Sequence, residues 1–308
     1  MIIIDHPDMI PAKSLVAGIG FFDGVHLGHR YLIDNIRKTA REKGLSSAVI
    51  TFRRHPREVL DKSYSLQLVS TFEERIRHLS ATGVDYCIVL DFTLEISRFS
   101  ARNFLELLVK HYGVAILYVG YDHRFGHNRS EDFYDYVRYG KELDIEILRA
   151  DVYSPDGMHV SSSEIRRLLA LGRVDEVGRL LTYHYTLRGR VVEGHRLGRK
   201  IGFPTANLQI EDSCKVIPAN GVYAVWVVTD ENRRYMGMLN IGTRPTVDNS
   251  NQRSIEVNLF DFSGNLYGSG LEIEFVSFIR PERRMRGIDE LKDQLQKDKE
   301  YTRGILLN

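Results

Sequence analysis

In the first half of the chain, short apolar runs alternate with longer stretches of helical periodicity. The apolar runs lack polar residues at alternate positions, which is typical of strands buried on both faces of a parallel sheet. The stretches between them repeat apolar residues every three to four positions and carry capping residues at their ends. The pattern therefore predicts an α/β domain. The predicted strands cover residues 15–19, 47–52, 86–90, 115–119 and 145–148.

After residue 183 the pattern changes to strands that follow one another without helices. These runs are rich in β-branched and aromatic residues, and short turns with Gly, Asn or Asp separate them. Such a series predicts an antiparallel sheet or a small barrel, closed by a terminal helix over residues 288–301. We therefore expect one domain over residues 1–183 and a second over residues 184–308. The predicted strands cover residues 185–193, 222–228, 235–241, 254–262 and 271–279.

The segment between the first predicted strand and the first predicted helix reads GFFDGVHLGH. Gly20, Gly24 and Gly28 allow a ligand to approach the backbone, and the N–H groups at the helix start favour an anion. His26 and His29 lie three positions apart, so both can donate hydrogen bonds to phosphate oxygens from one helix face. A plain turn with two surface histidines is the alternative. The density of Gly, Asp and His favours a phosphate site.

Two later segments of the first half could complete a nucleotide pocket. The loop after the strand over residues 115–119 reads GYDHRFGHNRS, in which Asp122 could contact base or ribose and the arginines could contact phosphates. The segment VSSSEIRRLL combines a capping box, Ser161 with Glu164, with Arg166 in the second helical turn. A polar surface loop and an ordinary capped helix are the respective alternatives.

The most distinctive loop of the second half reads EGHRLGRKIGFPTANLQ. Gly198 and Gly202, together with Arg199 and Lys200, make a flexible basic loop that is suited to cover phosphates. Pro204 stiffens the chain directly after it. A basic surface loop is the alternative, but the PTAN sequence that follows makes it less ordinary.

Oxygen-bearing side chains follow this loop and recur on a later strand. Thr205 and Asn207 suit a magnesium ion that bridges phosphates. In the strand over residues 254–262, apolar residues alternate with Glu256 and Asn258, which therefore share the opposite face. Most such glutamates are solvated, so spacing alone does not make Glu256 catalytic.

Composition and charge add little that is specific. The chain has 308 residues, with 42 basic and 41 acidic side chains and a net charge of +1, so nothing favours nucleic acid or a membrane surface. Cys87 and Cys214 lie far apart and fit a reducing compartment. The N-terminal segment contains Asp5 and Pro7 and lacks a basic lead, unlike a signal peptide. We expect a cytoplasmic protein.

Taken in order, these segments resemble a known family. GFFDGVHLGH resembles the GxFDGxHxGH signature of the HxGH nucleotidyltransferases, and with TFRRHP, GYDHRFG and SSSEIR it resembles the adenylyltransferase module of prokaryotic bifunctional riboflavin kinase/FAD synthetases. The PTAN loop, GVYAVWV, NIGTRPT, the Glu256 strand and FIRPERRM resemble the riboflavin kinase domain. The resemblance covers nearly the whole chain. The chain departs from the family pattern at Arg53, Arg54, His123, Ser130 and Met285.

The resemblance implies a Rossmann-like nucleotidyltransferase domain followed by an antiparallel β-barrel riboflavin kinase domain. It implies FMN synthesis from riboflavin and ATP, FAD synthesis from FMN and ATP, and a requirement for Mg²⁺. Glu256 matches the general base, Thr205 and Asn207 match the magnesium motif, and His26, His29 and Arg166 would stabilise charge on the phosphates. The implied partners are small molecules only, and we expect a monomer or a weak homo-oligomer. The other expected binding residues are Gly20, Phe22, Asp23, Gly24, Gly28, Gly120, Asp122, Arg129, Ser162, Gly198, Arg199, Lys200, Gly202, Pro204 and Arg280.

Three alternatives remain open from the sequence. The first is a riboflavin kinase whose N-terminal domain is inactive or acts on another substrate. The second is a different transferase joined to the kinase, because the HxGH signature also serves cytidylyl transfer. The third is a flavin-binding or regulatory protein without turnover. The nucleotide donor and the products formed would separate them.

Overall fold

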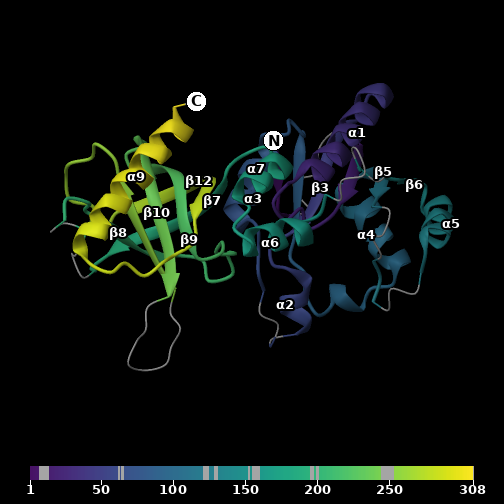
Figure 1. Cartoon of the computed structure of the whole chain (residues 1–308). Coiled ribbons are helices and arrows are strands. Elements are labelled where there is room, and N and C mark those ends of the chain that lie inside the picture. The colour runs from purple at the N-terminus through teal and green to yellow at the C-terminus, as the bar shows by residue number, and fades with distance from the viewer. Residues whose placement is uncertain are drawn as a thin grey trace. The chain divides into compact units, whose positions relative to one another are not determined.

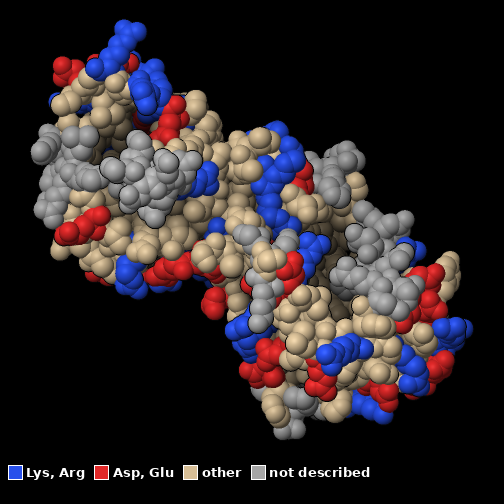
Figure 2. Space-filling view, turned by 90° about the horizontal axis from the view of Figure 1, so that it is seen from below, with Lys and Arg blue, Asp and Glu red and all other residues tan. Residues whose placement is uncertain are grey.

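A computed structural model describes the chain except residues 7–13, 62, 64–65, 121–124, 128–130, 152, 155–159, 195–197, 199–200, 244–252 and 308. The chain divides into two compact units, Met1–Ser162 and Ser163–Asn308, whose ribbons run from purple to teal and from teal to yellow in Figure 1. Lys and Arg side chains are intermixed with Asp and Glu over the face seen in Figure 2, as the balanced composition leads one to expect.

The first unit is built on a six-stranded parallel sheet with the order β1-β4-β3-β2-β5-β6. The chain moves from β2 through β3 to β4 in one direction and then returns to the other side of β2 with β5. The strand order therefore reverses between β2 and β5, and in such sheets ligands bind at the carboxyl ends of the strands at this point. The strands are β1 (Ile2–Ile4), β2 (Leu15–Ile19), β3 (Ser46–Phe52), β4 (Tyr86–Leu90), β5 (Val114–Val119) and β6 (Glu146–Arg149).

Helices with clear capping signals connect these strands. Thr71 and Glu74 form a capping box at the start of α3, while Gly44 and Gly113 end α1 and α4 in the left-handed conformation. The capping box and the glycine after α4 were predicted. The helices are α1 (Leu27–Lys43), α2 (Pro56–Leu60), α3 (Phe72–Ser80), the short 3₁₀ helix η2 (Ile96–Arg98), α4 (Ala101–Tyr112) and α5 (Phe133–Leu143).

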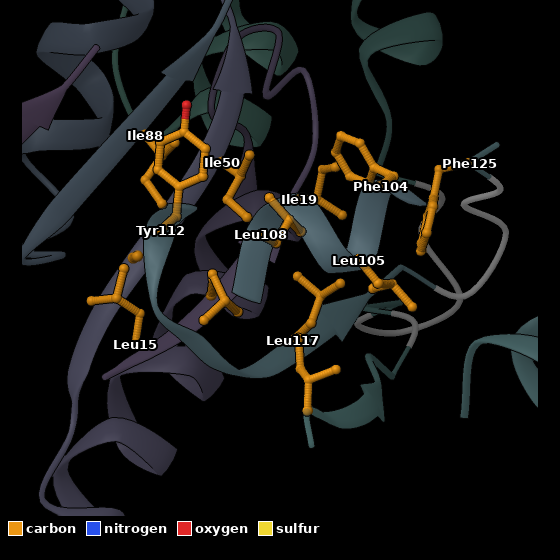
Figure 3. Close-up of a cluster of buried hydrophobic side chains, with 14 of the residues drawn as sticks. Leu15, Ile19, Ile50, Ile88, Phe104, Leu105, Leu108, Tyr112, Leu117 and Phe125 are labelled. Carbon is orange, nitrogen blue, oxygen red and sulfur yellow. The ribbon is translucent and has the colours of Figure 1, made fainter. Parts of the chain in front are cut away.

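Apolar side chains cover both faces of the parallel sheet. On one face, residues of β2, β3, β4 and β5 pack against α4, as Figure 3 shows for Ile19, Ile50 and Leu117 beside Leu105 and Leu108. On the other face, α1 and α3 pack against the sheet. Full burial stabilises the fold by about 1.5–3 kcal/mol for each large aliphatic side chain. The predicted doubly covered parallel sheet is confirmed.

The second unit is a closed antiparallel barrel with the order β10-β11-β8-β7-β12-β9. The predicted barrel is thus also confirmed. Two helices precede it, α6 (Ser162–Ala170) and α7 (Val174–Leu181), and α9 (Ile288–Leu306) ends the chain and packs on β9, β10 and β12. The strands are β7 (Tyr185–Val192), β8 (Ala206–Ile210), β9 (Gly221–Thr229), β10 (Arg234–Thr243), β11 (Arg253–Leu259) and β12 (Gly270–Arg280).

The observed units differ from the sequence-based division in one respect. The boundary between the two compact units lies after Ser162, and α7, which follows this boundary, packs on β12 and β7 of the barrel. Residues 163–183 therefore pack with the barrel, because the apolar face of α7 is buried there. The division into functional domains near residue 183 remains a proposal.

Candidate functional site

The GFFDGVHLGH turn connects β2 to α1 at the point where the strand order reverses. His26 is the N-cap of α1, and its Nδ1 accepts a hydrogen bond of 3.4 Å from the backbone N–H of His29. The two imidazole rings stack with centroids 3.7 Å apart. The predicted neighbours therefore lie together at the positive end of a helix dipole, where an anion is favoured.

Both histidines are suited to donate hydrogen bonds while uncharged. Burial, and then the neighbouring His26, lower the pKa of His29 well below its ordinary value of 6.5. His26 must be unprotonated at Nδ1 to accept there, so a neutral ring carries its proton on Nε2. Neutral imidazoles avoid the repulsion that a helix N-terminus would exert on an imidazolium. Each ring can therefore offer an N–H group to a phosphate without bringing a charge of its own.

The turn itself adopts an unusual backbone conformation. Phe22, Gly24 and Val25 have φ angles of 57°, 80° and 41°, in the left-handed region. Phe22 and Val25 are only 1% and 0% exposed, and their side chains anchor the turn in the core beside α1 and α3. The Phe22 side chain, which we expected at the ligand, is thus used for packing.

A buried polar network holds this turn in place. The Asp23 carboxylate is 5% exposed and accepts hydrogen bonds from the backbone N–H groups of Val69 and Ser70, both at 3.0 Å. The Ser70 hydroxyl in turn accepts from the Gly24 N–H at 2.9 Å, and the Ser162 hydroxyl donates to the Asp23 carbonyl at 2.9 Å. Asp23 therefore fixes the turn. The part played by Ser70 was missed, because its partner lies 46 residues away.

Two glycines of the motif leave room for neighbouring rings. A Cβ at Gly20 would lie 3.3 Å from the Phe22 ring, and one at Gly28 would lie 3.3 Å from the His26 ring. Both distances are tighter than ordinary van der Waals contact, so a side chain at either position would push on the turn. Glycine at these two positions thus allows the rings of Phe22 and His26 to pack against the backbone of the motif.

The remaining predicted residues of the first site are less fully defined. Gly120 follows β5 and is partly buried, so its loop begins next to the turn after β2. Asp122 and Arg129 lie outside the described residues. Arg166 lies in α6, where its guanidinium donates to the Ser163 hydroxyl at 3.4 Å.

Arg53 and Arg54 depart from the family pattern, and both are exposed. The Arg53 guanidinium donates to Asp91 at 3.2 Å and lies 5.2 Å from the centroid of the Phe72 ring. Arg53 is thus held at the surface by contacts with Asp91 and Phe72.

In the barrel, pairing of β8 with β11 brings the predicted kinase residues together. Glu256 lies opposite Asn207, and the Thr205 hydroxyl donates to Glu256 Oε2 at 3.3 Å. Asn258 is next on the same face of β11 and donates to the Pro204 carbonyl at 2.6 Å. The sequence predicted that Glu256 and Asn258 share one face of the strand. It did not predict the hydrogen bond of Asn258 to the PTAN segment.

Glycines in the preceding loop allow this segment to pack closely. A Cβ at Gly194 would overlap the Asn207 amide, and one at Gly198 would overlap the Phe203 carbonyl. Gly202 has a φ of 85°, which side chains other than glycine rarely tolerate. Arg199 and Lys200 of this loop lie outside the described residues.

Two cavities of about 280 Å³ each meet at Thr205. The first, called here the Glu256 cavity, is lined by Glu256, Asn258, Arg280 and residues of α9. The second, called here the Tyr267 cavity, is lined by Pro204, Tyr267 and other residues after β11. Since Thr205 lines both and donates to Glu256, ligands bound in the two cavities would both lie against Thr205. The residues around Tyr267 were not predicted as a site.

The donor set beside Glu256 suits a magnesium ion carried by a nucleotide. Magnesium usually keeps several waters and takes few protein oxygens in addition to substrate phosphates. The Thr205 hydroxyl and the Asn207 amide, across from Glu256, provide such oxygens. Within the described part of the chain there is no cluster of three or more His, Cys, Asp or Glu that could hold a metal alone.

Comparison with known proteins decides the family. A family model described as FAD synthetase matches residues 9–164, and one described as riboflavin kinase matches residues 181–306. The bifunctional riboflavin kinase/FMN adenylyltransferase of Escherichia coli (strain K12) is 37% identical over 289 residues, which cover 94% of this chain and 91% of that protein. The chain belongs to this family.

Other relatives agree in extent. The family member of Bacillus subtilis (strain 168) is 35% identical over 314 residues, covering 96% of this chain and 95% of that protein. A crystal structure described as a macrolide-efflux protein from Streptococcus pneumoniae has a TM-score of 0.86 and 32% identity, with 98% of each chain covered. Among the described residues of this chain, no helix has the length and apolarity needed to cross a membrane. Both domains of the family are thus present in one chain.

Proposed function

We propose that this chain phosphorylates riboflavin with ATP to give FMN and ADP, and adenylates FMN with a second ATP to give FAD and pyrophosphate. The observation that carries the proposal is that one chain contains both family domains, each with its motif residues brought together. The proposal assigns the second reaction to a domain over residues 1–183 and the first to a domain over residues 184–308.

In the kinase reaction, riboflavin would occupy the Glu256 cavity and ATP the Tyr267 cavity. Glu256 would accept the proton of the terminal ribityl hydroxyl, and the freed oxygen would attack the γ-phosphorus as ADP leaves. Thr205 and Asn207 would hold the magnesium ion, which neutralises phosphate charge when bound. Gly198, Arg199, Lys200 and Gly202 would cover the phosphates. The contact of Thr205 with Glu256 supports this arrangement.

In the adenylyl transfer, an oxygen of the FMN phosphate would attack the α-phosphorus of ATP, and pyrophosphate would leave. The FMN phosphate is already ionised, so no nucleophile from the protein is needed. His26 and His29 would donate hydrogen bonds to the phosphates, and Arg166 would add positive charge. The lowered pKa of His29 supports a role as a neutral donor. Gly120, Asp122 and Arg129 would contact the nucleotide.

The contacts of Asp23 and Phe22 refine two of the expected binding residues. Because the Asp23 carboxylate accepts from two backbone N–H groups, we assign it to positioning of the turn. The Phe22 side chain would serve the same end through the core. The proposal retains the expectations of a cytoplasmic enzyme that binds no nucleic acid and acts as a monomer or weak homo-oligomer.

The proposal is tested by incubating the purified protein with riboflavin, ATP and magnesium and separating the flavins over time. We expect FMN first and FAD later, and FAD alone when FMN is supplied. FMN that accumulates without FAD would favour the alternative of a kinase with a silent first domain. Flavin binding without any product would contradict the proposal and favour a binding protein.

A further inference from the structure

One face of α9 forms part of the wall of the Glu256 cavity. Leu291 and Leu295 line that cavity, and Asp298 and Thr302 follow at the spacing that keeps them on the same helix face. Asp298 is only 2% exposed, although it follows the apolar Leu291 and Leu295 on this face. A buried carboxylate here requires partners, because its desolvation is costly.

Arg280, the last residue of β12, is the main partner of Asp298. Its Nε donates to both carboxylate oxygens, at 3.1 and 3.0 Å, and its Nη2 donates to Oδ2 at 2.8 Å. The remaining guanidinium nitrogen, Nη1, donates to the Pro281 carbonyl at 3.1 Å. Every nitrogen of the Arg280 guanidinium therefore has a protein partner, although Arg280 itself lines the Glu256 cavity.

The contacts of Asp298 extend to a second cavity-lining arginine. Gln294, one turn before Asp298, donates from Nε2 to Asp298 Oδ1 at 2.7 Å. The Gln294 Oε1 accepts from Arg283 Nη2 at 2.8 Å, and Arg283 also lines the Glu256 cavity. Asp298 thus connects the end of β12, the helix α9 and the segment between them. We call these four residues, Arg280, Arg283, Gln294 and Asp298, the α9 latch.

The buried ion pair of Arg280 with Asp298 is not needed for the stability of the folded barrel. An apolar pair can replace a buried ion pair at equal or greater stability, whereas the ion pair holds its partners in one geometry. A second ion pair between α9 and the barrel, Arg303 with Asp261, is much more exposed, with side-chain exposures of 39% and 67%. The pair of Arg280 with Asp298 is at 18% and 3%. Of these two pairs, the buried one includes a residue of the cavity wall, Arg280.

We propose that Asp298 is a positioning residue for the flavin. Through the α9 latch it fixes the register of α9 in which Leu291, Leu295, Arg280 and Arg283 shape one wall of the Glu256 cavity. Asp298 does not line the cavity, so it acts through its partners. The inference rests on the proposed function to the extent that riboflavin is the occupant of this cavity.

The test compares Asp298→Asn with the matched variant Asp261→Asn, which weakens the exposed pair. In Asp298→Asn we expect the riboflavin KM, and the riboflavin Kd from quenching of flavin fluorescence, to rise about tenfold or more. We expect kcat to change less than about threefold, because Glu256 and Thr205 belong to the strands and not to α9. FAD synthesis from supplied FMN should be unchanged. Asp261→Asn should change the riboflavin KM less than about twofold.

Hydrogen exchange gives a readout independent of activity. Amides around Leu291 and Leu295 should exchange faster in Asp298→Asn than in Asp261→Asn. A riboflavin KM and Kd equal to those of the wild type in Asp298→Asn would overturn the inference. So would a fall in kcat at constant KM, because a positioning residue for the flavin acts on binding.

A second variant tests the inference in case Asp298→Asn does not fold. In the double variant Arg280→Met with Asp298→Leu no lone charge is buried, so the barrel should remain folded even if Asp298→Asn does not. Because Arg280 itself lines the cavity, this variant tests the pair of Arg280 and Asp298 as a unit. We expect it also to bind riboflavin about tenfold or more weakly, and normal binding would overturn the inference. Absence of phosphorylation by the wild-type protein would defeat the proposed function alone, since the fluorescence measurement still decides the role of Asp298.

Discussion

Replacement of Glu256 by Gln is the sharpest perturbation of the proposed kinase site. Glutamine has nearly the shape of glutamate and keeps an oxygen that can accept from the Thr205 hydroxyl, a contact of 3.3 Å in the wild type. The pairing of β8 with β11 does not depend on this side chain. The substitution therefore leaves the cavity in place and removes only the capacity to accept the substrate proton.

The size of the effect distinguishes a base from a structural contact. Weakening one hydrogen bond from a charged to a neutral acceptor costs about 1 kcal/mol, or roughly fivefold to tenfold in rate. Loss of a general base costs about a hundredfold to ten-thousandfold, which corresponds to about 3–5 kcal/mol of activation free energy. We therefore expect Glu256→Gln to lower kcat for FMN formation by at least about a hundredfold.

The assay measures FMN formation at saturating riboflavin and ATP, and FAD formation from supplied FMN in the same preparation. FAD formation should be unchanged. Glu231→Gln, the same substitution at an exposed residue, serves as the control. A fall of less than about tenfold in FMN formation would refute the role of Glu256 as the base. Equal loss of both activities would refute the division into two sites.

Three further predictions follow from the described contacts. Because burial lowers the pKa of His29, this side chain takes up a proton below about pH 6.5 in the unfolded chain but not in the folded chain. The free energy of unfolding should therefore decrease as the pH is lowered below this value, by up to about 1.4 kcal/mol per pH unit. Urea unfolding should show a smaller fall in His29→Gln, and an identical slope would count against the buried neutral state. Gly194→Ala should displace the Asn207 amide and lower kinase activity while sparing FAD synthesis from FMN, and wild-type kinase activity would show that the Asn207 position is unimportant. Asp23→Asn should destabilise the first unit by about 1–3 kcal/mol and lower FAD synthesis, because the buried acceptor loses its charge and the amide nitrogen that replaces Oδ2 cannot accept from the Val69 N–H. Unchanged urea unfolding would contradict this role of Asp23.

The local sequence pattern was sufficient to predict those elements whose residues alone define their type and bounds. The strands β2 and β4 were predicted with the observed bounds, because each is an apolar run bounded by polar or turn residues. The alternation around Glu256 correctly placed Glu256 and Asn258 on one face of β11. The HxGH segment was predicted as an anion site from its glycines and histidines alone, and the structure stacks its histidines at the start of α1.

The features that were missed depend on partners far away in the sequence. The strand β8 has the sequence ANLQI, too polar and too short to be recognised, and it forms because β7 and β11 flank it. Ser70 becomes part of the first site only through Asp23 and Gly24. Asp298 looks like one more polar residue of an amphipathic helix until Arg280 is placed against it. Long-range packing, rather than local propensity, decides all three.

The most direct test of two separate transfers in one chain follows the label of ATP into the flavins. With ATP labelled at the γ-phosphorus, we expect the label in FMN first and then, still attached, in FAD. With ATP labelled at the α-phosphorus, the label should enter FAD and pyrophosphate should be unlabelled, while FMN stays unlabelled. Label from the α-phosphorus in FMN, or FAD formed from riboflavin without label from the γ-phosphorus, would contradict the account.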